Sequence, residues 1–321
     1  MKSFEGRIAV VTGGGTGMGR ELVRQLAAEG CHVAMCDLSG EAMDASRALA
    51  LEGAPADTRV TTFRADVSDE SQVAAFRDAV VADHTTNAIH LLFNNAGIAG
   101  GGSVVTDSRA EWERTFGVDW GGVYHCTRAF LPLLLAADAG HVVNTSSING
   151  LWASIGPQQP HTAYCAAKFA VRGFTEALIA DFRVNAPHLR ASVVMPGHIG
   201  TDIITNTSRA HGHDPASMDE RELAAVRVQA ARRGLPVDQI SDDDLRKGMQ
   251  LMAETFRDMA PTSAAEAATI ILDGVRNDEW RILVGHDAEV VDERVRADPV
   301  HAYDVEFWDG LRADGLFGGF G

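Results

Sequence analysis

The sequence contains no apolar stretch long enough to cross a membrane. Its longest run, residues 129–137, has nine residues and includes Pro132, whereas a membrane-spanning helix needs about 20 apolar residues. The N-terminus also lacks the basic region and long apolar stretch of a secretion signal. We therefore expect a cytoplasmic protein with no membrane partner.

The sequence has few cysteines, and its basic residues are fewer than its acidic residues. The four cysteines form no C-x-x-C pair and no cluster with histidine, so we expect buried free thiols and no zinc or other metal site. The 28 lysines and arginines are outnumbered by 44 acidic residues, which gives a net charge of −16. A nucleic-acid partner would need a basic face, so this charge argues against one.

A glycine-rich turn comes directly after the first short run of β-branched residues. Residues 7–12 predict a buried strand, residues 13–19 form the turn, and residues 20–29 carry apolar positions at helical spacing. In this order the glycines let the backbone approach a pyrophosphate, whose charge the N–H groups at the helix start can bind. The order predicts a dinucleotide site, and the alternative is an ordinary tight turn.

The second predicted strand, residues 31–36, ends at Asp37, which lies 18 residues after Gly19. An acidic residue at about this distance can accept hydrogen bonds from the adenine ribose hydroxyls, and it repels a 2′-phosphate. Leu38 follows it, and the turn carries no arginine or lysine before Gly19, where an NADP enzyme would be expected to place a cation. We predict NAD as the cofactor; the alternative is a surface aspartate.

Tyr164 and Lys168 stand in the spacing Y-x-x-x-K, after the serine pair Ser146-Ser147. Residues four apart share one face of a helix, so the Lys168 charge can lie near the Tyr164 oxygen. A nearby cation favours the phenolate and lowers the tyrosine pKa, as a proton-transfer catalyst near neutral pH requires. Such pairs also occur by chance on exposed helices, so the weight of this one depends on the other motifs.

Together these motifs resemble the short-chain dehydrogenases/reductases, from about residue 4 to about residue 285. Thr12-Gly13 with Gly17 and Gly19 match the family's T-G-x-x-x-G-x-G, residues 94–97 match its N-N-A-G, and residues 195–201 match its proline-glycine turn. The resemblance implies an α/β fold, a doubly wound parallel sheet of the Rossmann type with helices on both faces. It also implies an oxidoreductase that uses a nicotinamide cofactor.

The resemblance assigns roles to the motif residues. Tyr164 would exchange a proton with the substrate oxygen, Lys168 would depress the tyrosine pKa and bind the nicotinamide ribose, and Ser147 would hold the carbonyl oxygen. Ser146 would be structural. The implied cofactor contacts are Gly13, Thr16, Gly17, Met18, Gly19, Asp37, Leu38, Asp66, Val67, Asn94, Ala96, Gly97, Tyr164, Lys168, Pro196, Gly197, Ile199 and Thr201. No metal is required by this chemistry.

The chain departs from the family pattern at Asp119, where most relatives carry an asparagine that helps to hold a water in the relay to the catalytic lysine. An aspartate can also bind water, but its charge would offset part of the Lys168 field. We treat Asp119 as a fourth catalytic candidate, a relay residue; local hydrogen bonding within a helix is the alternative.

A second departure is the distance of 17 positions from Ser147 to Tyr164, which is longer than the spacing common in the family. The extra residues, within 156–161, would reshape the substrate entrance. His161 lies in this segment, and we expect it to serve packing or substrate contact more than acid–base catalysis.

No linker interrupts the α/β pattern, so we expect a single domain over residues 1–321, with a substrate lid inserted at residues 202–262 and a C-terminal extension at residues 286–321. Within the lid, apolar residues recur on one face of a predicted helix, with Ser241 as its cap. They are Leu245, Met249, Met252, Phe256 and Met259. This face would line an apolar substrate pocket or pack on the core. The extension would cover the active site or a neighbouring subunit of a homo-oligomer, a dimer or a tetramer.

The sequence therefore predicts an NAD-dependent short-chain alcohol dehydrogenase or ketone reductase. Its small-molecule substrate would be a secondary alcohol or ketone, apolar or bulky. One alternative is a 3-oxoacyl thioester reductase, which Asp37 disfavours because reductive biosynthesis usually draws on NADP. The other is a non-catalytic dinucleotide-sensing protein, against which the intact Ser147, Tyr164 and Lys168 argue.

Overall fold

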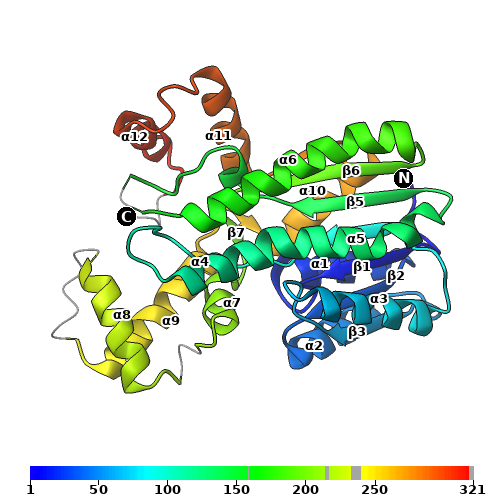
Figure 1. Cartoon of the computed structure of the whole chain (residues 1–321), viewed down its shortest axis with the longest axis horizontal. Helices are drawn as coiled ribbons and strands as arrows, with labels where there is room; N and C mark the ends of the chain where they lie inside the picture. Colours follow the sequence, from blue (N-terminus) through cyan, green and yellow to red (C-terminus); the bar gives the residue numbers. More distant parts are fainter. Residues whose placement is uncertain (158, 214–216, 233–239, 318–321) are drawn as a thin grey trace.

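The computed structural model describes residues 1–157, 159–213, 217–232 and 240–317. Its centre is a parallel seven-stranded sheet in the order β3-β2-β1-β4-β5-β6-β9 (Figure 1). The strands are β1 (Ile8–Thr12), β2 (His32–Asp37), β3 (Val60–Arg64), β4 (Leu91–Asn94), β5 (Gly140–Thr145), β6 (Leu189–Pro196) and β9 (Arg281–Val284). The strand order reverses between β1 and β4, which is the point where doubly wound sheets bind their ligands.

Helices cover both faces of the sheet, which confirms the predicted doubly wound fold. One face is covered by α1 (Gly17–Ala28), α2 (Gly40–Glu52) and α10 (Ala264–Arg276), and the other by α3 (Glu70–His84), α5 (Gly122–Leu135) and α6 (Thr162–Asn185). Because side chains alternate along a strand, Val11 joins the first core and Val10 joins the second. Both cores are built from fully buried aliphatic and aromatic side chains, so the sheet is a rigid support for its edges.

The helix that carries Asp119 changes its winding at that residue. The segments α4 (Arg109–Phe116), η1 (Gly117–Gly121) and α5 follow one another without a break, and η1 is π-helical. Ser108 and Glu111 form a capping box at the start of α4. Single π-helical turns inside α-helices occur frequently at functional sites, and here the wider turn contains Asp119.

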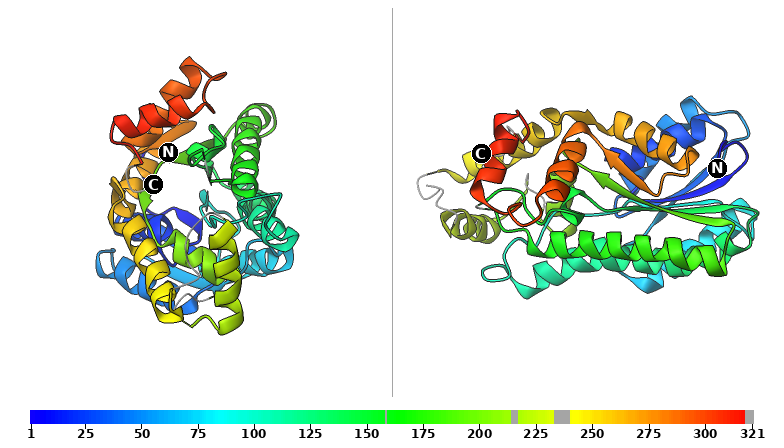
Figure 2. Two further views of the ribbon diagram at one scale, coloured as in Figure 1. Left: turned by 90° about the vertical axis from the view of Figure 1, so that its left-hand side faces the viewer. Right: turned by 90° about the horizontal axis from the view of Figure 1, so that it is seen from above.

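Between β6 and α10 the chain forms a separate group of elements. These are β7 (Ile199–Gly200), α7 (Ile203–Ala210), α8 (Glu220–Arg232), α9 (Asp242–Asp258) and β8 (Thr262–Ser263), and β7 pairs with β8 in parallel. Figures 1 and 2 show α8 and α9 beyond the carboxyl edge of the large sheet. No helix in the described part of the chain is long and apolar enough to span a membrane.

The predicted α9 helix is present, but its apolar face is only half packed. Ser241 caps it, since its Oγ accepts a hydrogen bond from the Asp244 N–H at 3.1 Å. Leu245 is buried against α8. Met252 and Met259, however, are 58% and 67% exposed, so a single continuous packed face is wrong for the second half of the helix. This end of α9 packs against the turn before β7, since the Phe256 carbonyl lies 2.7 Å from His198 Nε2.

The C-terminal extension packs on the segment that follows β5. Its helices are α11 (His286–Ala297) and α12 (Val305–Ala313). The Trp152 ring stacks on Trp308 with centroids 5.9 Å apart, and Trp152 Nε1 donates to the Ala302 carbonyl at 2.6 Å. The Ala153 N–H donates to the Tyr303 hydroxyl at 3.2 Å. The extension therefore supports the segment between Ser147 and Tyr164; residues 318–321 and Gln158 lie outside the described residues.

Candidate active site

Ser147, Tyr164 and Lys168 come together at the carboxyl end of β5, as predicted. Tyr164 and Lys168 lie in the first two turns of α6, and the Lys168 Nζ is 5.2 Å from the centroid of the Tyr164 ring. The Ser147 side chain lies close enough to the Tyr164 phenol to lower its pKa. Ser147 also caps a short 3-10 turn, η2 (Ile148–Gly150), by accepting from the Asn149 N–H at 3.1 Å. These contacts fix the hydroxyl of Ser147 next to the phenol.

Ser146 has a different position from its neighbour. Its Oγ is buried and donates to the Lys168 carbonyl at 2.8 Å. This bond ties the end of β5 to the α6 backbone, which fits the structural role that the resemblance implies.

Asp119 contacts Lys168 directly. Its Oδ1 lies 3.2 Å from the Lys168 Nζ and accepts from the Ile98 N–H at 3.1 Å. The same Nζ donates to the Thr145 carbonyl at 3.2 Å. Both side chains of the pair are buried, and Asp119 Oδ2 has no hydrogen-bond partner among the described residues. The aspartate is therefore a counter-ion of Lys168. Its role in a water relay stays a prediction.

The pKa of Tyr164 is set by opposing effects of its neighbours. Burial raises this pKa above its ordinary value, Lys168 lowers it, and Asp119 opposes Lys168. Lys168 therefore acts in the predicted direction, but burial and the Asp119 charge outweigh it, so the pKa of Tyr164 is raised overall. Burial lowers the pKa of Lys168, but Asp119 and Tyr164 raise it above its usual range. At neutral pH the site thus holds a protonated phenol beside a charged ammonium.

The glycine turn has the shape that a dinucleotide requires. Gly13 has φ +69°, and a Cβ there would lie 2.9 Å from the Ala96 Cα. Thr12 Oγ1 accepts from the N–H groups of Asn95 and Ala96 at 3.0 Å each, so the segment after β4 is held against the turn. The first turn of α1 contains no acidic residue, and the Thr16 side chain does not cap it. Its N–H groups are therefore available to an anionic group such as a diphosphate.

Asp37 lies at the end of β2, where its carboxylate faces the glycine turn. Its Oδ2 accepts from the Gly15 N–H at 3.0 Å and its Oδ1 from the Ser39 N–H at 3.2 Å. Arg20, which directly follows the turn, donates to the Gly15 carbonyl at 2.7 Å and to Ser46 Oγ at 3.1 Å. This cation is held by protein oxygens, so the acidic group dominates the site expected for the ribose.

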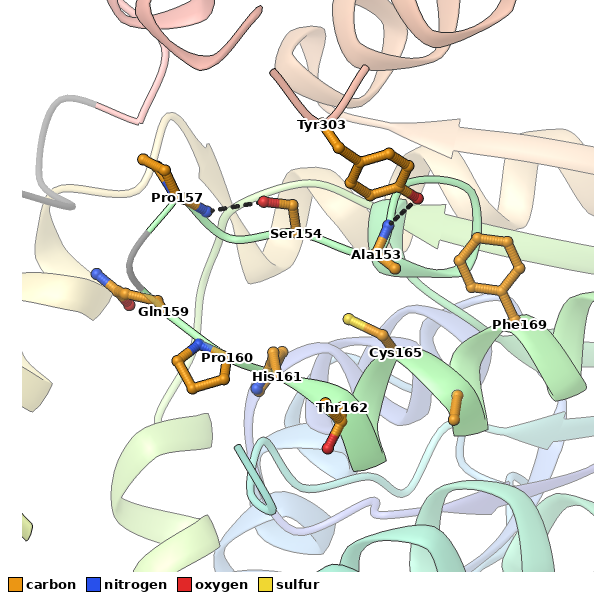
Figure 3. A pocket seen from close by; sticks show the side chains of 12 residues that line it. Ala153, Ser154, Pro157, Gln159, Pro160, His161, Thr162, Cys165, Phe169 and Tyr303 are labelled. Carbon is orange, nitrogen blue, oxygen red and sulfur yellow. Dashed lines mark hydrogen bonds between the residues drawn. The ribbon is translucent and has the colours of Figure 1, made fainter. Parts of the chain in front are cut away.

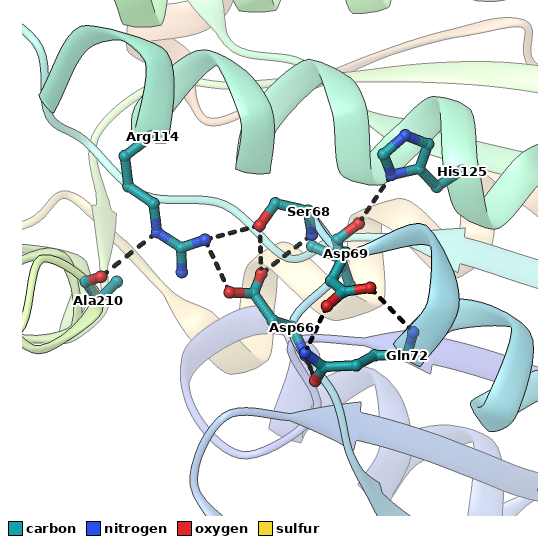
Figure 4. A network of polar contacts seen from close by, with 8 residues as sticks. Asp66, Ser68, Asp69, Gln72, Arg114, His125 and Ala210 are labelled. Carbon is teal, nitrogen blue, oxygen red and sulfur yellow. Dashed lines mark hydrogen bonds and ion pairs between the residues drawn. The ribbon is translucent and has the colours of Figure 1, made fainter. Parts of the chain in front are cut away.

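Asp66 belongs to a polar network that the sequence did not indicate (Figure 4). Its Oδ2 lies 2.7 Å from Arg114 Nη1, and its Oδ1 accepts from the Ser68 hydroxyl at 2.7 Å. Burial favours a higher pKa for Asp66, but Ser68 and Arg114 outweigh it and hold the pKa below its usual range. Arg114 also donates through Nε to the Ala210 carbonyl at 3.3 Å. No motif marks Arg114, since it acts only through contacts distant in the sequence.

The Asn94 side chain is held by bonds to neighbouring elements. Its side chain is buried and donates to Thr127 Oγ1 at 3.0 Å and to Asn144 Oδ1 at 2.7 Å. Its neighbour Asn95, which was not among the predicted contacts, donates to the Thr12 carbonyl at 3.1 Å. The bonds of Asn94 join β4 to α5 and β5, and the place of Asn94 along the cofactor channel stays a prediction.

Four predicted residues lie at the end of β6 or directly after it, namely Pro196, Gly197, Ile199 and Thr201. Pro196 ends β6, Ile199 is buried on β7, and the Thr201 Cγ2 would lie 3.0 Å from a Cβ at Gly17. This last approach brings the turn after β6 against the glycine turn, as an enclosed cofactor requires.

Gly197 lies against the carboxylate of Asp287, whose Oδ2 accepts from the His198 N–H at 2.6 Å.

The segment before Tyr164 lines a cavity of about 830 Å³, together with the start of α6 and Tyr303 (Figure 3). His161 lies on its wall, and the ring of His161 is 4.6 Å from the Tyr164 ring between centroids. Tyr164 and Lys168 do not line this cavity, which therefore lies beside them. The cavity and these two residues are connected through His161, which is the position expected for a substrate entrance.

Comparisons with known proteins agree with this geometry. A family model described as short chain dehydrogenase matches residues 7–212. SadH of Mycobacterium tuberculosis, named as an oxidoreductase, is 36% identical over 297 residues, which cover 92% of each chain. Levodione reductase of Leifsonia aquatica is 35% identical over 231 residues, 72% of this chain and 82% of that protein. The structure of a short chain dehydrogenase/reductase from Burkholderia phymatum in complex with NAD superposes with a TM-score of 0.73 and 28% identity, covering 94% of this chain and 96% of the other.

Proposed function

The chain belongs to the short-chain dehydrogenase family, and we propose that it is an NAD(H)-dependent oxidoreductase that interconverts a secondary alcohol and a ketone. The observation that carries the proposal is the arrangement of Tyr164, which lies close to the Ser147 side chain and beside the Lys168 ammonium. A phenol, a hydroxyl and a cation in this order can bind a carbonyl oxygen and protonate it.

The residues around the glycine turn fit NAD. The uncapped first turn of α1 can bind the diphosphate, and Gly13 and Gly17 leave room for it. The Asp37 carboxylate can accept from both ribose hydroxyls and would repel a 2′-phosphate. The related structure from Burkholderia phymatum, which contains NAD, supports this choice.

In the reductive direction, bound NADH supplies the hydride. Ser147 holds the substrate oxygen, and Tyr164, protonated at neutral pH, donates its proton to that oxygen as charge develops there. Lys168 then stabilises the phenolate, because its charge lies next to the ring. Asp119 keeps Lys168 protonated through their ion pair. In the oxidative direction, Tyr164 accepts the proton of the alcohol.

We place the substrate among apolar or bulky ketones and alcohols. The cavity beside His161 is walled by side chains such as Pro157, Pro160, Phe169 and Tyr303, which favour an apolar ligand. A relative at 35% identity is named for reduction of levodione, which supports the reductive use of a small ketone.

The test is a turnover assay followed at the NADH absorbance. Cyclic, aryl and short linear ketones would be compared with an acyl thioester, and the matching alcohols would be tested with NAD. We expect the bulky ketones to give the highest kcat/KM. Faster reduction of the thioester would favour the thioester reductase, and NADH binding without turnover of any compound would favour a dinucleotide sensor.

A further inference from the structure

Helix α7 is half-buried against its neighbours. None of its residues is fully buried, although it directly follows the turn that approaches Gly17. A helix of eight residues is marginally stable on its own. Its position therefore depends on the polar contacts that it makes with neighbouring elements, and these contacts lead to three parts of the dinucleotide site.

The first contact reaches the glycine turn. The Asn206 Nδ2 donates to the Thr16 Oγ1 at 2.8 Å. Thr16 is the N-cap residue of α1, and its own side chain does not bond to that helix. Asn206 thus lies beside the N–H groups that would bind the diphosphate, 190 positions away from Thr16 in the sequence.

The second contact reaches the segment after β4. The Ala99 N–H donates to the Thr207 Oγ1 at 2.8 Å. Ala99 follows Ala96 and Gly97, and Ala96 is held to Thr12. Asn206 and Thr207 therefore join α7 to the two elements between which a dinucleotide lies in a doubly wound sheet.

The third contact reaches the adenine side. Arg114 Nε donates to the Ala210 carbonyl at the end of α7. The same guanidinium donates through Nη1 to Ser68 Oγ at 2.6 Å and pairs with Asp66 at 2.7 Å. Figure 4 shows Arg114 between Ala210 and the Asp66–Ser68 pair. One side chain thus links the lid to the residue expected at the adenine.

We propose that Asn206, Thr207 and Arg114 are positioning residues that hold α7 closed over the cofactor and set how long NAD(H) stays bound. The inference rests on the proposed NAD(H) function. According to this inference, α7 is a lid for the cofactor as well as for the substrate. When closed, α7 covers the dinucleotide from the diphosphate to the adenine. Opening requires the loss of these hydrogen bonds, so each of them slows release of the cofactor.

The test measures the NADH dissociation rate by stopped-flow fluorescence, in the full chain. Asn206→Ala should release NADH about five-fold faster than the wild type, since one hydrogen bond is lost. Thr207→Val should have a similar effect. Arg209→Ala, at an exposed position of the same helix, is the matched control and should leave the rate unchanged. Circular dichroism would verify that each variant is folded.

A double-mutant cycle separates the α7 contact from the direct effect of Thr16 on the cofactor. In a Thr16→Ala background, Asn206→Ala should add less than about two-fold, because its partner is already gone. Unchanged release in both Asn206→Ala and Thr207→Val, or fully additive effects in the cycle, would overturn the inference while wild-type NADH binding stands. A wild type that binds no NADH would instead overturn the proposed function, and this inference with it.

Discussion

The Lys168 ammonium lies 3.2 Å from the carboxylate of Asp119, and both groups are buried. This ion pair distinguishes the site from one in which a neutral residue faces the lysine. The lysine charge then acts on two partners, the Tyr164 ring on one side and Asp119 on the other. The negative charge of Asp119 partly cancels the effect of the Lys168 charge on the phenolate. The pKa of Tyr164, which burial already raises, therefore stays high. Such a site is suited to proton donation, the step required in ketone reduction.

Replacement of Asp119 by asparagine tests this balance. Asp119→Asn keeps an oxygen for the Ile98 N–H but removes the negative charge, so Lys168 should lower the pKa of Tyr164 more effectively. The kcat/KM profile for alcohol oxidation should move to lower pH by about one unit. A thermal melt is the control, because loss of one buried partner costs about 3–5 kcal/mol of stability. A profile that superposes on the wild type in a folded variant would contradict the role of Asp119.

Tyr164→Phe should reduce turnover by about 10²–10⁴-fold, since the proton donor is removed with little change in volume. NADH affinity should stay close to that of the wild type. The measurement is the initial rate with the best ketone, and Tyr124→Phe, which alters an exposed tyrosine on α5, is the matched control. If the variant keeps substantial activity, another acid donates the proton. The first candidate is His161, whose ring is 4.6 Å from that of Tyr164.

Much of the fold and of this site follows from local sequence patterns. The glycine turn, the residue at the end of β2 and the Y-x-x-x-K pair are each defined by short spacings. Asp37 therefore lies against the glycine turn and Lys168 lies beside Tyr164, as expected. In a parallel sheet the ends of the strands meet at one edge, and that rule extends the prediction from single motifs to a site.

The parts that could not be predicted depend on contacts between distant segments. The pKa of Tyr164 is set by burial and by Asp119, which is 45 positions away. Arg114 has no motif of its own and is recognised only through Asp66 and Ala210. The outer methionines of α9 follow a perfect helical period, but periodicity cannot say whether a neighbouring element is present to cover them.

Asp37→Ser should narrow the preference for NADH over NADPH by about ten-fold, because a charged acceptor for the ribose hydroxyls is lost and a 2′-phosphate is no longer repelled. Titration of the reduced cofactors by fluorescence gives both dissociation constants. Asp44→Ser, on the exposed side of α2, removes the same charge outside the site and should leave the ratio unchanged. Equal affinity of the wild type for the two cofactors would refute the assignment of NAD.

His141 should make the fold sensitive to mild acid. Burial lowers its pKa to about 4, and its Nε2 is hydrogen-bonded to Ser192 Oγ at 2.7 Å. The unfolded chain binds this proton near pH 6.5 and the folded protein only near pH 4. The stabilising effect of the neutral ring is therefore present above pH 6.5 and is lost as the pH falls toward 4, by on the order of 3 kcal/mol.

Urea unfolding at pH 7 and pH 5 measures this loss. His141→Gln keeps a polar group for Ser192 but cannot be protonated, so its free energy of unfolding should fall less between the two pH values than that of the wild type. His286→Gln, at an exposed histidine, is the control and should follow the wild type. The same pH slope in His141→Gln as in the wild type would assign the acid sensitivity to other groups. The first to test is His84, whose pKa burial also lowers to about 4.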